Sequence, residues 1–175
     1  MRSQVVYESM FGNTAAIAEA IAAGLRTHGT VEVLSVCEAA STPAPSVDLL
    51  VVGGPTHAFG LSRQRTRLDA ADRTDAPIAL DIGIREWLDA ALPAPAGSRA
   101  AAFGTKVAKP PWLPGSAAHA VGKRLRRLGY QLADEPMDFL VDGMTGPLSE
   151  GESARARAWA ELLAFTEHDR IAHLH

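Results

Sequence analysis

The chain has 175 residues, of which 47% are hydrophobic, so it is long enough to form one domain with a full core. Its net charge of −3 is too small to indicate a nucleic acid or another strongly charged partner. One cysteine, Cys37, excludes an internal disulfide, and no apolar stretch is long enough to cross a membrane. Because Arg2 leads directly into a strand pattern, we expect no signal peptide. The length predicts a single domain over residues 1–175, and the lone cysteine favours the reducing cytoplasm.

The first predicted element is a short apolar strand that runs through Tyr7 and Glu8 into a small, polar turn, from which a helix begins. The first N–H groups of a helix have no partner within the helix, and the helix dipole is positive at that end. Such a turn can therefore bind an anion, and we predict a phosphate site here. Its residues are Ser9, Met10, Phe11, Gly12, Asn13 and Thr14.

Helices and strands then alternate along the chain. We expect the first helix to end at Gly29, a strand at 31–36, a Pro-rich loop at 41–46 and a strand at 49–52. The last of these is continuously apolar, which is typical of a strand covered on both faces. It ends in a second turn, too rich in Gly and Pro for regular structure. The residues of this turn are Pro55, Thr56, His57, Ala58, Phe59 and Gly60.

The next segment, 61–81, is polar and carries four arginines, which indicates a short helix with an irregular continuation. Helical spacing returns at 84–92, and a fourth strand follows at 99–103. This strand ends in a third loop that begins with Gly104, Thr105 and Lys106. The three loops thus follow strands 1, 3 and 4.

The last third of the chain predicts two helices and one strand. Ser116 is a suitable N-cap for a helix, and a fifth strand at 130–141 is interrupted near Pro136. The spacing of Ser149 and Glu152 predicts a capping box at the start of the last helix. The residues expected together on one side of that helix are Trp159, Leu162, Leu163 and Thr166. Strands separated by helices indicate a parallel sheet with right-handed crossovers.

The strand followed by Tyr7, Ser9, Phe11 and the run Gly12–Thr14 resembles the FMN-phosphate loop of the flavodoxin family. The order of the elements is similar to this family over nearly the whole chain. The resemblance implies an α/β fold with a doubly wound, five-stranded parallel sheet in the order 2-1-3-4-5 and helices on both faces. For that order, the ligand is expected at the carboxyl ends of strands 1 and 3.

The resemblance also implies a binding mode for FMN. The hydroxyls of Ser9 and Thr14 and the N–H groups of the turn would hold the phosphate, although Phe11 stands where most flavodoxins have a hydroxyl residue. The loops Pro55–Gly60 and Gly104–Lys106 would form the two walls of the flavin site. His57 or Phe59 would stack on one side of the ring and Trp112 on the other. A cation at Lys106 would make the potential of the fully reduced flavin less negative than is usual in the family.

Three functions remain open. The first is an FMN protein that carries electrons between a reductase and an acceptor protein. The second is an FMN-dependent NAD(P)H:quinone-type oxidoreductase, in which the arginines of segment 62–73 hold a substrate or nicotinamide phosphate. The third is a binding module of the same fold without flavin.

Other kinds of site are not supported by the sequence. The nucleophile pattern Gly-x-Ser-x-Gly and the dinucleotide fingerprint are absent, and His168, His173 and His175 lack further ligands at fixed spacing, so we predict no catalytic residue and no metal site. The third strand ends in glycines where a response-regulator receiver would need Asp. The cations at 123–127 are expected on the outer face of a helix, which does not indicate nucleic-acid binding.

Overall fold

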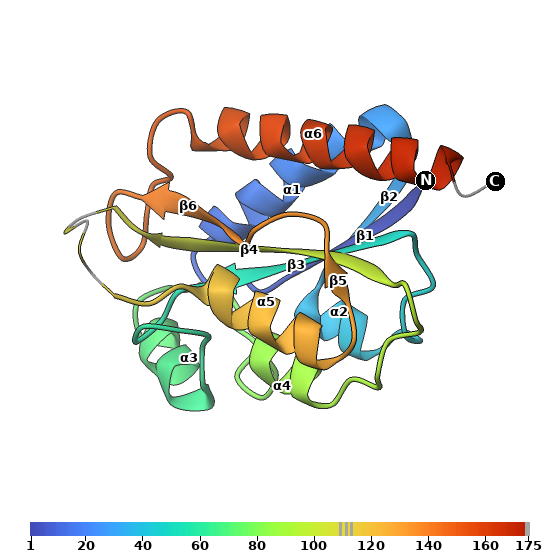
Figure 1. Ribbon diagram of the computed structural model, residues 1–175. Helices are drawn as coiled ribbons and strands as arrows, with labels where there is room; N and C mark the ends of the chain where they lie inside the picture. The colour runs from blue at the N-terminus through green and yellow to red at the C-terminus, as the bar shows by residue number, and fades with distance from the viewer. Residues whose placement is uncertain (109, 111, 113, 174–175) are drawn as a thin grey trace.

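The computed structural model describes residues 1–108, 110, 112 and 114–173, which form a parallel sheet between two layers of helices (Figure 1). The strands are β1 (Arg2–Tyr7), β2 (Thr30–Ser35), β3 (Leu49–Pro55), β4 (Arg99–Val107), β5 (Gln131–Leu132) and β6 (Met137–Val141). The helices are α1 (Asn13–Leu25), the short η1 (Arg26–His28), α2 (Val36–Ala40), α3 (Gln64–Ala71), α4 (Ile84–Asp89), α5 (Ala117–Arg127) and α6 (Glu152–Ala172).

The strand order is β2-β1-β3-β4-β5, and every strand pair is parallel. The fifth strand is divided: β5 pairs with the start of β4 at Arg99 and Ala100, and β6 pairs with β4 from Phe103 to Val107. Pro136 lies between the two segments, where its missing N–H interrupts the ladder. The predicted order 2-1-3-4-5 and the interruption of the fifth strand are therefore confirmed.

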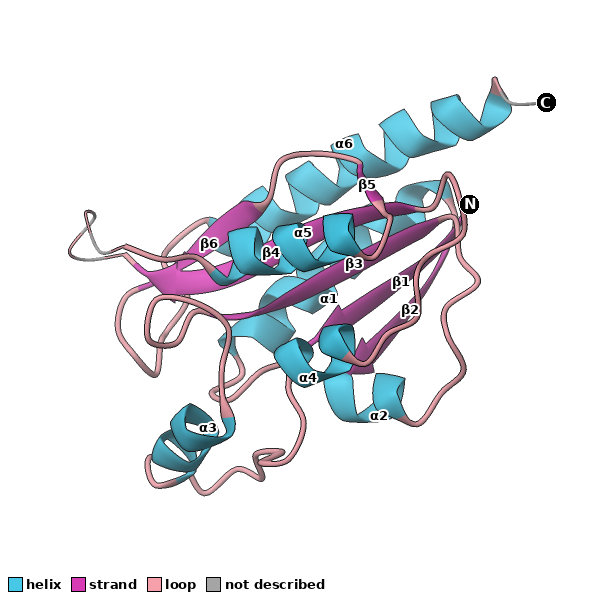
Figure 2. Cartoon of the chain, turned by 60° about the horizontal axis from the view of Figure 1, so that its bottom comes forward, coloured by secondary structure: helices cyan, strands magenta, loops and turns pink. Residues whose placement is uncertain are grey.

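Each face of the sheet has its own apolar core, because successive strand residues point to opposite faces. Val5 packs in the core under α1 and α6, together with Phe103 and Trp159. Its neighbour Val6 packs in the second core, which the helices α2, α4 and α5 cover. Figure 2 shows α3 standing off the sheet, beyond the carboxyl ends of the strands. None of the described helices is both long and apolar enough to span a membrane.

The helices α1 and α6 pack closely because their contact surfaces are built from small residues. A Cβ on Gly24 would lie 2.4 Å from the Arg157 carbonyl oxygen and 2.7 Å from the Ala160 Cβ. The buried side of α6 consists of Ala156, Trp159, Ala160, Leu163, Ala164 and Glu167, with Glu152 at its start. Leu162 is 61% exposed and Thr166 is exposed, so of the four residues expected on one side, Trp159 and Leu163 alone belong to the buried face.

The start of α6 also differs from the prediction. Its N-cap is Gly151, in the left-handed region at φ 82°, and no side chain caps it. The Ser149 hydroxyl donates to Asp142 Oδ1 over 2.6 Å, and Glu152 accepts from the Leu140 N–H over 2.6 Å instead of returning to the N-cap. The capping-box prediction was therefore wrong, because both side chains have partners on the β6 side of the helix.

The other helix and strand ends differ less from the prediction. A true capping box between Ser35 and Glu38 starts the short helix α2, which the sequence did not predict. The strands β3 and β4 run to Pro55 and Val107, beyond their apolar stretches. The predicted N-cap at Ser116 is confirmed, since its hydroxyl accepts from the His119 N–H over 3.1 Å.

Candidate functional site

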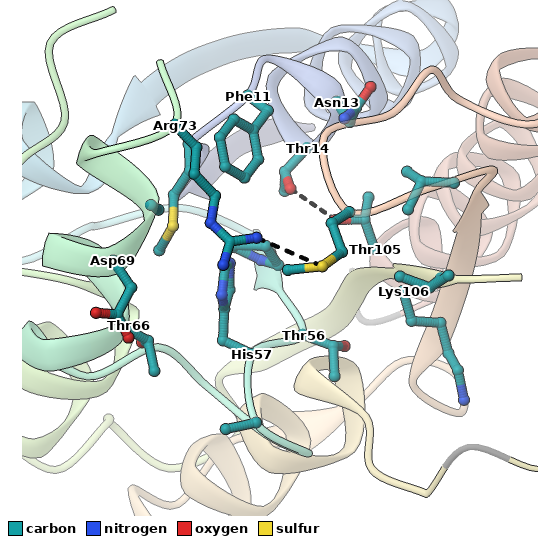
Figure 3. A pocket seen from close by; sticks show the side chains of 17 residues that line it. Phe11, Asn13, Thr14, Thr56, His57, Thr66, Asp69, Arg73, Thr105 and Lys106 are labelled. Carbon is teal, nitrogen blue, oxygen red and sulfur yellow. Dashed lines mark hydrogen bonds between the residues drawn. The ribbon is translucent and has the colours of Figure 1, made fainter. Parts of the chain in front are cut away.

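The three loops meet at one edge of the sheet. The strands β1, β3 and β4 are parallel neighbours, with Tyr7 opposite Gly53 and Gly53 opposite Phe103, so their carboxyl ends reach the same edge. A pocket of about 250 Å³ lies between the loops (Figure 3). The predicted site residues that line it are Met10, Phe11, Asn13, Thr14, Pro55, Thr56, His57, Ala58, Thr105 and Lys106.

The first turn has the features of an anion site. Gly12 is the N-cap of α1 in the left-handed conformation (φ 87°), and no side chain caps the first N–H groups of this helix. The Ser9 Oγ is buried and has no hydrogen-bond partner among the described residues. The Thr14 and Thr105 hydroxyls are 2.8 Å apart and join the start of α1 to the end of β4. Unpaired donors at a helix N-terminus fit a phosphate group.

The turn separates two pockets. Ser9 and Gly12 do not line the main pocket, but a neighbouring one together with Glu8 and Cys37. Met10 borders both pockets. A phosphate on the N–H groups of the turn would therefore lie at the boundary, with the main pocket on the side of the second and third loops.

Asn13 fixes the turn to the loop after β6. Its Nδ2 donates to the Thr145 carbonyl over 3.1 Å, and a Cβ on Gly146 would lie 2.6 Å from the Asn13 amide. This close contact holds the 142–147 loop beside the phosphate turn, and Met144 of that loop lines the main pocket. The sequence did not predict this wall.

The second loop turns sharply at its tip. Backbone hydrogen bonds between His57 and Gly60 close it, at 2.8 and 3.0 Å, and both Ala58 (φ 43°) and Phe59 (φ 70°) are left-handed. This turn leaves His57 in the pocket, whereas Phe59 is 61% exposed and does not line it. Burial lowers the pKa of the His57 imidazole, so this ring is neutral at neutral pH.

The prediction that Gly104, Thr105 and Lys106 begin the third loop was wrong, because all three pair within the sheet as residues of β4. Gly104 is buried, and a Cβ there would lie 2.8 Å from the Ala118 N, so its role is close packing against α5. Trp112 is 77% exposed and does not line the pocket. The aromatic rings that do line it are those of Phe11 and His57, and neither comes from the third loop.

Lys106 lines the pocket with its stem, while its ammonium group lies outside. The Nζ donates to the Gly115 carbonyl over 3.4 Å, and Figure 3 shows the side chain pointing away from the centre of the view. The influence of Lys106 on a flavin potential stays a prediction, which potentiometry of Lys106→Ala would test by a fall in the potential.

The sequence missed one side of the pocket, which comes from α3 and the turn after it. Arg73 enters from this side, and its Nη1 lies 3.5 Å from the Met144 Sδ. The segment carried a signal, its arginines, but nothing in the sequence showed which of them faces the site. The lining residues outside the predicted set are Thr66, Asp69, Ala70, Arg73, Val107, Val141 and Met144.

A buried polar cluster holds the α3 segment against β1. The guanidinium of Arg67, 1% exposed, donates to the Leu80 carbonyl (2.9 Å), to the Ser62 Oγ (3.0 Å) and to Glu86 (3.1 Å). Glu8 in turn accepts hydrogen bonds from the Ser62 hydroxyl and from the Ile84 N–H. Burial raises the pKa of Glu8, and these hydrogen bonds oppose the rise only in part.

Across the described ranges, no group of three or more His, Cys, Asp or Glu side chains is arranged to hold a metal ion.

Comparison with known proteins identifies one matching family. A sequence profile described as Flavodoxin matches residues 5–107, more than half of the chain. A search of curated protein sequences found no significant match.

Solved structures share the fold. A flavodoxin from the domain Archaea is 22% identical with a TM-score of 0.63, over 95% of this chain and 99% of that one. The oxidised flavodoxin 2 of Bacillus cereus is 19% identical with a TM-score of 0.62, over 94% and 99%. The flavodiiron protein of Giardia intestinalis is 18% identical with a TM-score of 0.58, over 95% of this chain but 36% of its own.

Proposed function

This chain belongs to the flavodoxin family, and we propose on that basis that it binds FMN and carries electrons between a reductase and an acceptor protein in the cytoplasm. Membership of the family implies a flavin. FMN supplies the redox chemistry through its isoalloxazine ring when it is bound. The chain's own contribution is to hold the phosphate, to enclose the ring and to limit its contact with water.

One observation carries the proposal: the turn before α1 offers unpaired donors beside a pocket that the loop after β3 and the end of β4 border. At this turn, the Ser9 Oγ and the first N–H groups of α1 are donors without partners among the described residues. Burying a hydroxyl without a partner costs about 1–3 kcal/mol, and at a helix N-terminus an anionic ligand can offset that cost for Ser9. A phosphate monoester is the part of FMN that fits these donors.

The pocket walls suit the flat ring system of a flavin. Phe11 and the neutral His57 offer rings, and Pro55, Thr56 and Thr105 offer the ends of two adjacent strands. Aromatic stacking contributes about 0.5–1.5 kcal/mol per pair beyond the burial of area. Because Phe59 and Trp112 lie outside the pocket, we expect FMN to bind less tightly than a site with a ring on each wall would allow.

A second function is favoured by one observation, the cation of Arg73 at the pocket. An NAD(P)H:quinone-type oxidoreductase needs a group that binds a second, anionic reactant beside the flavin, and Arg73 could serve that purpose. The two functions differ in what reduces the flavin. A carrier requires a reductase protein, whereas the enzyme accepts hydride directly from NAD(P)H.

Titration of the purified protein with FMN tests the proposal. We expect quenching of flavin fluorescence and a rise in melting temperature, because a ligand at about 100 times its Kd stabilises the folded state by about 2.7 kcal/mol. Loss of the flavin colour on adding NADPH alone would favour the oxidoreductase, and loss only after adding a reductase would favour the carrier. If saturating FMN changes neither fluorescence nor melting temperature, the protein is a binding module without flavin.

A further inference from the structure

Arg73 is the arginine of the α3 segment that lines the pocket, and its guanidinium has no acidic partner among the described residues, whereas Arg67 pairs with Glu86. Arg73 lies in the turn after α3, and no salt bridge joins it to a carboxylate within the described part of the chain. Its side chain contact is with the Met144 Sδ at 3.5 Å, and a thioether is a weak acceptor. Figure 3 shows the Arg73 side chain reaching into the pocket.

The backbone that carries Arg73 is held by buried contacts of the preceding helix, while the Arg73 side chain itself is exposed. Arg67, two turns earlier, is buried and bonded to Leu80, Ser62 and Glu86, so it anchors the helix from behind. The same cluster reaches Glu8, which directly precedes the phosphate turn. A buried guanidinium with three partners holds α3 in a defined orientation, and this orientation directs Arg73 toward the pocket.

The other charged and titratable groups of the pocket leave an anion with one obvious partner. Lys106 sends its Nζ to the Gly115 carbonyl, and the imidazole of His57 is neutral because burial lowers its pKa. Asp69 also lines the pocket and would repel an anion. Among the described lining residues, Arg73 is therefore the cation best placed to meet a negative charge.

The phosphate turn has no side-chain hydroxyl at Phe11, and Arg73 can supply hydrogen-bond donors in place of one. Phe11 lines the pocket with an aromatic ring and offers no hydroxyl, while Met10, Asn13 and Thr14 of the same turn line it as well. A planar guanidinium can donate two parallel N–H bonds to phosphate oxygens. The side chain thus faces the same space as the turn and has the chemistry that the turn lacks.

We infer that Arg73 is a phosphate-binding residue of this site, which supplements the main chain of the Ser9–Thr14 turn in place of a hydroxyl at Phe11. This inference rests on the proposed binding of FMN, and the 5′-phosphate of that flavin is the phosphate group to which we assign Arg73. On binding, the guanidinium exchanges its contact with Met144 for the phosphate oxygens. The segment 62–84 then acts as a scaffold that brings a cation to the flavin phosphate.

Paired titrations with FMN and riboflavin test this role, because the two flavins share the ring and differ in the phosphate. The variants are Arg73→Gln and Arg73→Lys, with Arg65→Gln as the matched control, since Arg65 is exposed on α3, in the same segment, and lies outside the pocket. We expect Arg73→Gln to raise the Kd for FMN about tenfold and to leave that for riboflavin unchanged. Arg73→Lys should retain part of the affinity, and Arg65→Gln all of it.

Salt provides an independent readout. Screening weakens a partly exposed ionic contact, so the affinity of the wild-type protein for FMN should fall as ionic strength rises, and Arg73→Gln should reduce this dependence. Equal affinity of the wild type and Arg73→Gln for FMN would overturn the inference. An equal loss for FMN and riboflavin would also overturn it, because Arg73 would then contact the ring.

A protein that binds neither flavin would refute the proposed function without deciding the role of Arg73. Inorganic phosphate is then the probe. If phosphate raises the melting temperature of the wild type and of Arg65→Gln more than that of Arg73→Gln, Arg73 binds phosphate without flavin. The same shift in all three proteins would refute its role as an anion ligand.

Discussion

The backbone N–H of Ile84 donates a hydrogen bond to Glu8 Oε2 over 2.9 Å and so joins the end of β1 to the start of α4. The same carboxylate accepts from the Ser62 hydroxyl, and a Cβ on Gly83 would lie 2.8 Å from Glu8 Oε2. One buried side chain therefore closes the loop of chain that carries α3. The loop delivers one wall of the pocket, so the stability of this contact matters for the site.

Two substitutions of Glu8 should distinguish the stability that its hydrogen bonds contribute from the effect of its charge. Glu8→Ala leaves the Ile84 N–H without its acceptor, and we expect the free energy of unfolding at neutral pH to fall by about 2 kcal/mol. Glu8→Gln keeps an acceptor for Ile84 and can donate to Ser62, so the loss should stay below about 1 kcal/mol. Urea denaturation measures both. Equal losses for the two variants would show that the hydrogen bonds contribute little.

The effect of Glu8 on the free energy of unfolding should depend on pH in a defined direction. Burial is the main reason that the pKa of Glu8 lies above the ordinary value of 4.5, so the folded protein holds this proton to a higher pH than the unfolded chain. The stability that depends on protonation of Glu8 is therefore complete below about pH 4.5 and is lost as the pH rises through the raised pKa, whereas the hydrogen-bond acceptors remain at neutral pH. Wild type should gain stability relative to Glu8→Gln between neutral pH and about pH 4.5. A constant difference over this range would contradict the prediction.

The stability that the ion pairs of Glu167 contribute should depend on pH in the opposite direction. Its carboxylate is buried and accepts from Arg99 at 2.6 Å and from Arg170 at 2.7 Å. Burial raises its pKa, but these hydrogen bonds outweigh burial and hold the pKa below 4.5. Its contribution is therefore present above about pH 4.5 and is lost as the pH falls through the lowered pKa.

We expect Glu167→Ala to cost about 3 kcal/mol at neutral pH, because it leaves Arg99 largely buried and unpaired. The matched control is Glu161→Ala, which removes an exposed i,i+4 pair with Arg157 on the same helix and should cost about 0.5 kcal/mol. Urea denaturation at neutral pH and in acid measures both effects. The difference between wild type and Glu167→Ala should shrink in acid, and a difference that grows there would exclude this account.

Gly24→Ala should destabilise the protein although alanine is the better helix former. The added Cβ would lie 2.4 Å from the backbone oxygen of Arg157, and backbone cannot move aside cheaply. Alanine gains about 1 kcal/mol in helix propensity, whereas overpacking costs about 1–3 kcal/mol. We expect a net loss in thermal stability, measured by circular dichroism. Gly60→Ala is the control, because a Cβ there meets nothing within 4 Å.

The sequence predicted the topology well because its signals are local. An apolar strand, a turn with Gly12 and a periodic helix can be recognised within a few residues, and the connections between strands then follow from chain order. The inner side of α6 was harder to predict. Periodicity favours large residues such as Leu162, whereas the close approach to Gly24 selects Ala156, Ala160 and Ala164.

The pocket wall formed by Arg73 and Met144 could not be read from the sequence. These residues are 71 positions apart and come from two irregular segments, so no periodic pattern relates them. Four arginines between 63 and 73 look alike in the sequence, yet Arg67 is buried in a structural cluster and Arg73 lines the pocket. Only tertiary packing separates these roles. The predicted capping box of α6 was wrong for the same reason, because Ser149 and Glu152 have hydrogen-bond partners near β6 instead.

Two serines in β1 and the turn after it provide the most direct test of the phosphate site. The Oγ atoms of Ser3 and Ser9 are both buried without a hydrogen-bond partner among the described residues. Ser3 lies at the start of β1, away from the site, and Ser9 lies in the phosphate turn. Removing an unpaired buried hydroxyl relieves its desolvation, so neither Ser3→Ala nor Ser9→Ala should lower the free energy of unfolding by more than about 0.5 kcal/mol.

The two variants should differ in FMN binding. A hydrogen bond to a charged group contributes about 1.5–3 kcal/mol, so Ser9→Ala should raise the Kd for FMN at least about tenfold, whereas Ser3→Ala should not change it. Fluorescence titration measures the affinity and urea denaturation the stability of the same samples. Because Ser9 would act on the phosphate, its removal should leave riboflavin binding intact. A loss of FMN affinity in both variants, or in neither, would mean that the unpaired hydroxyl of Ser9 is not a phosphate ligand.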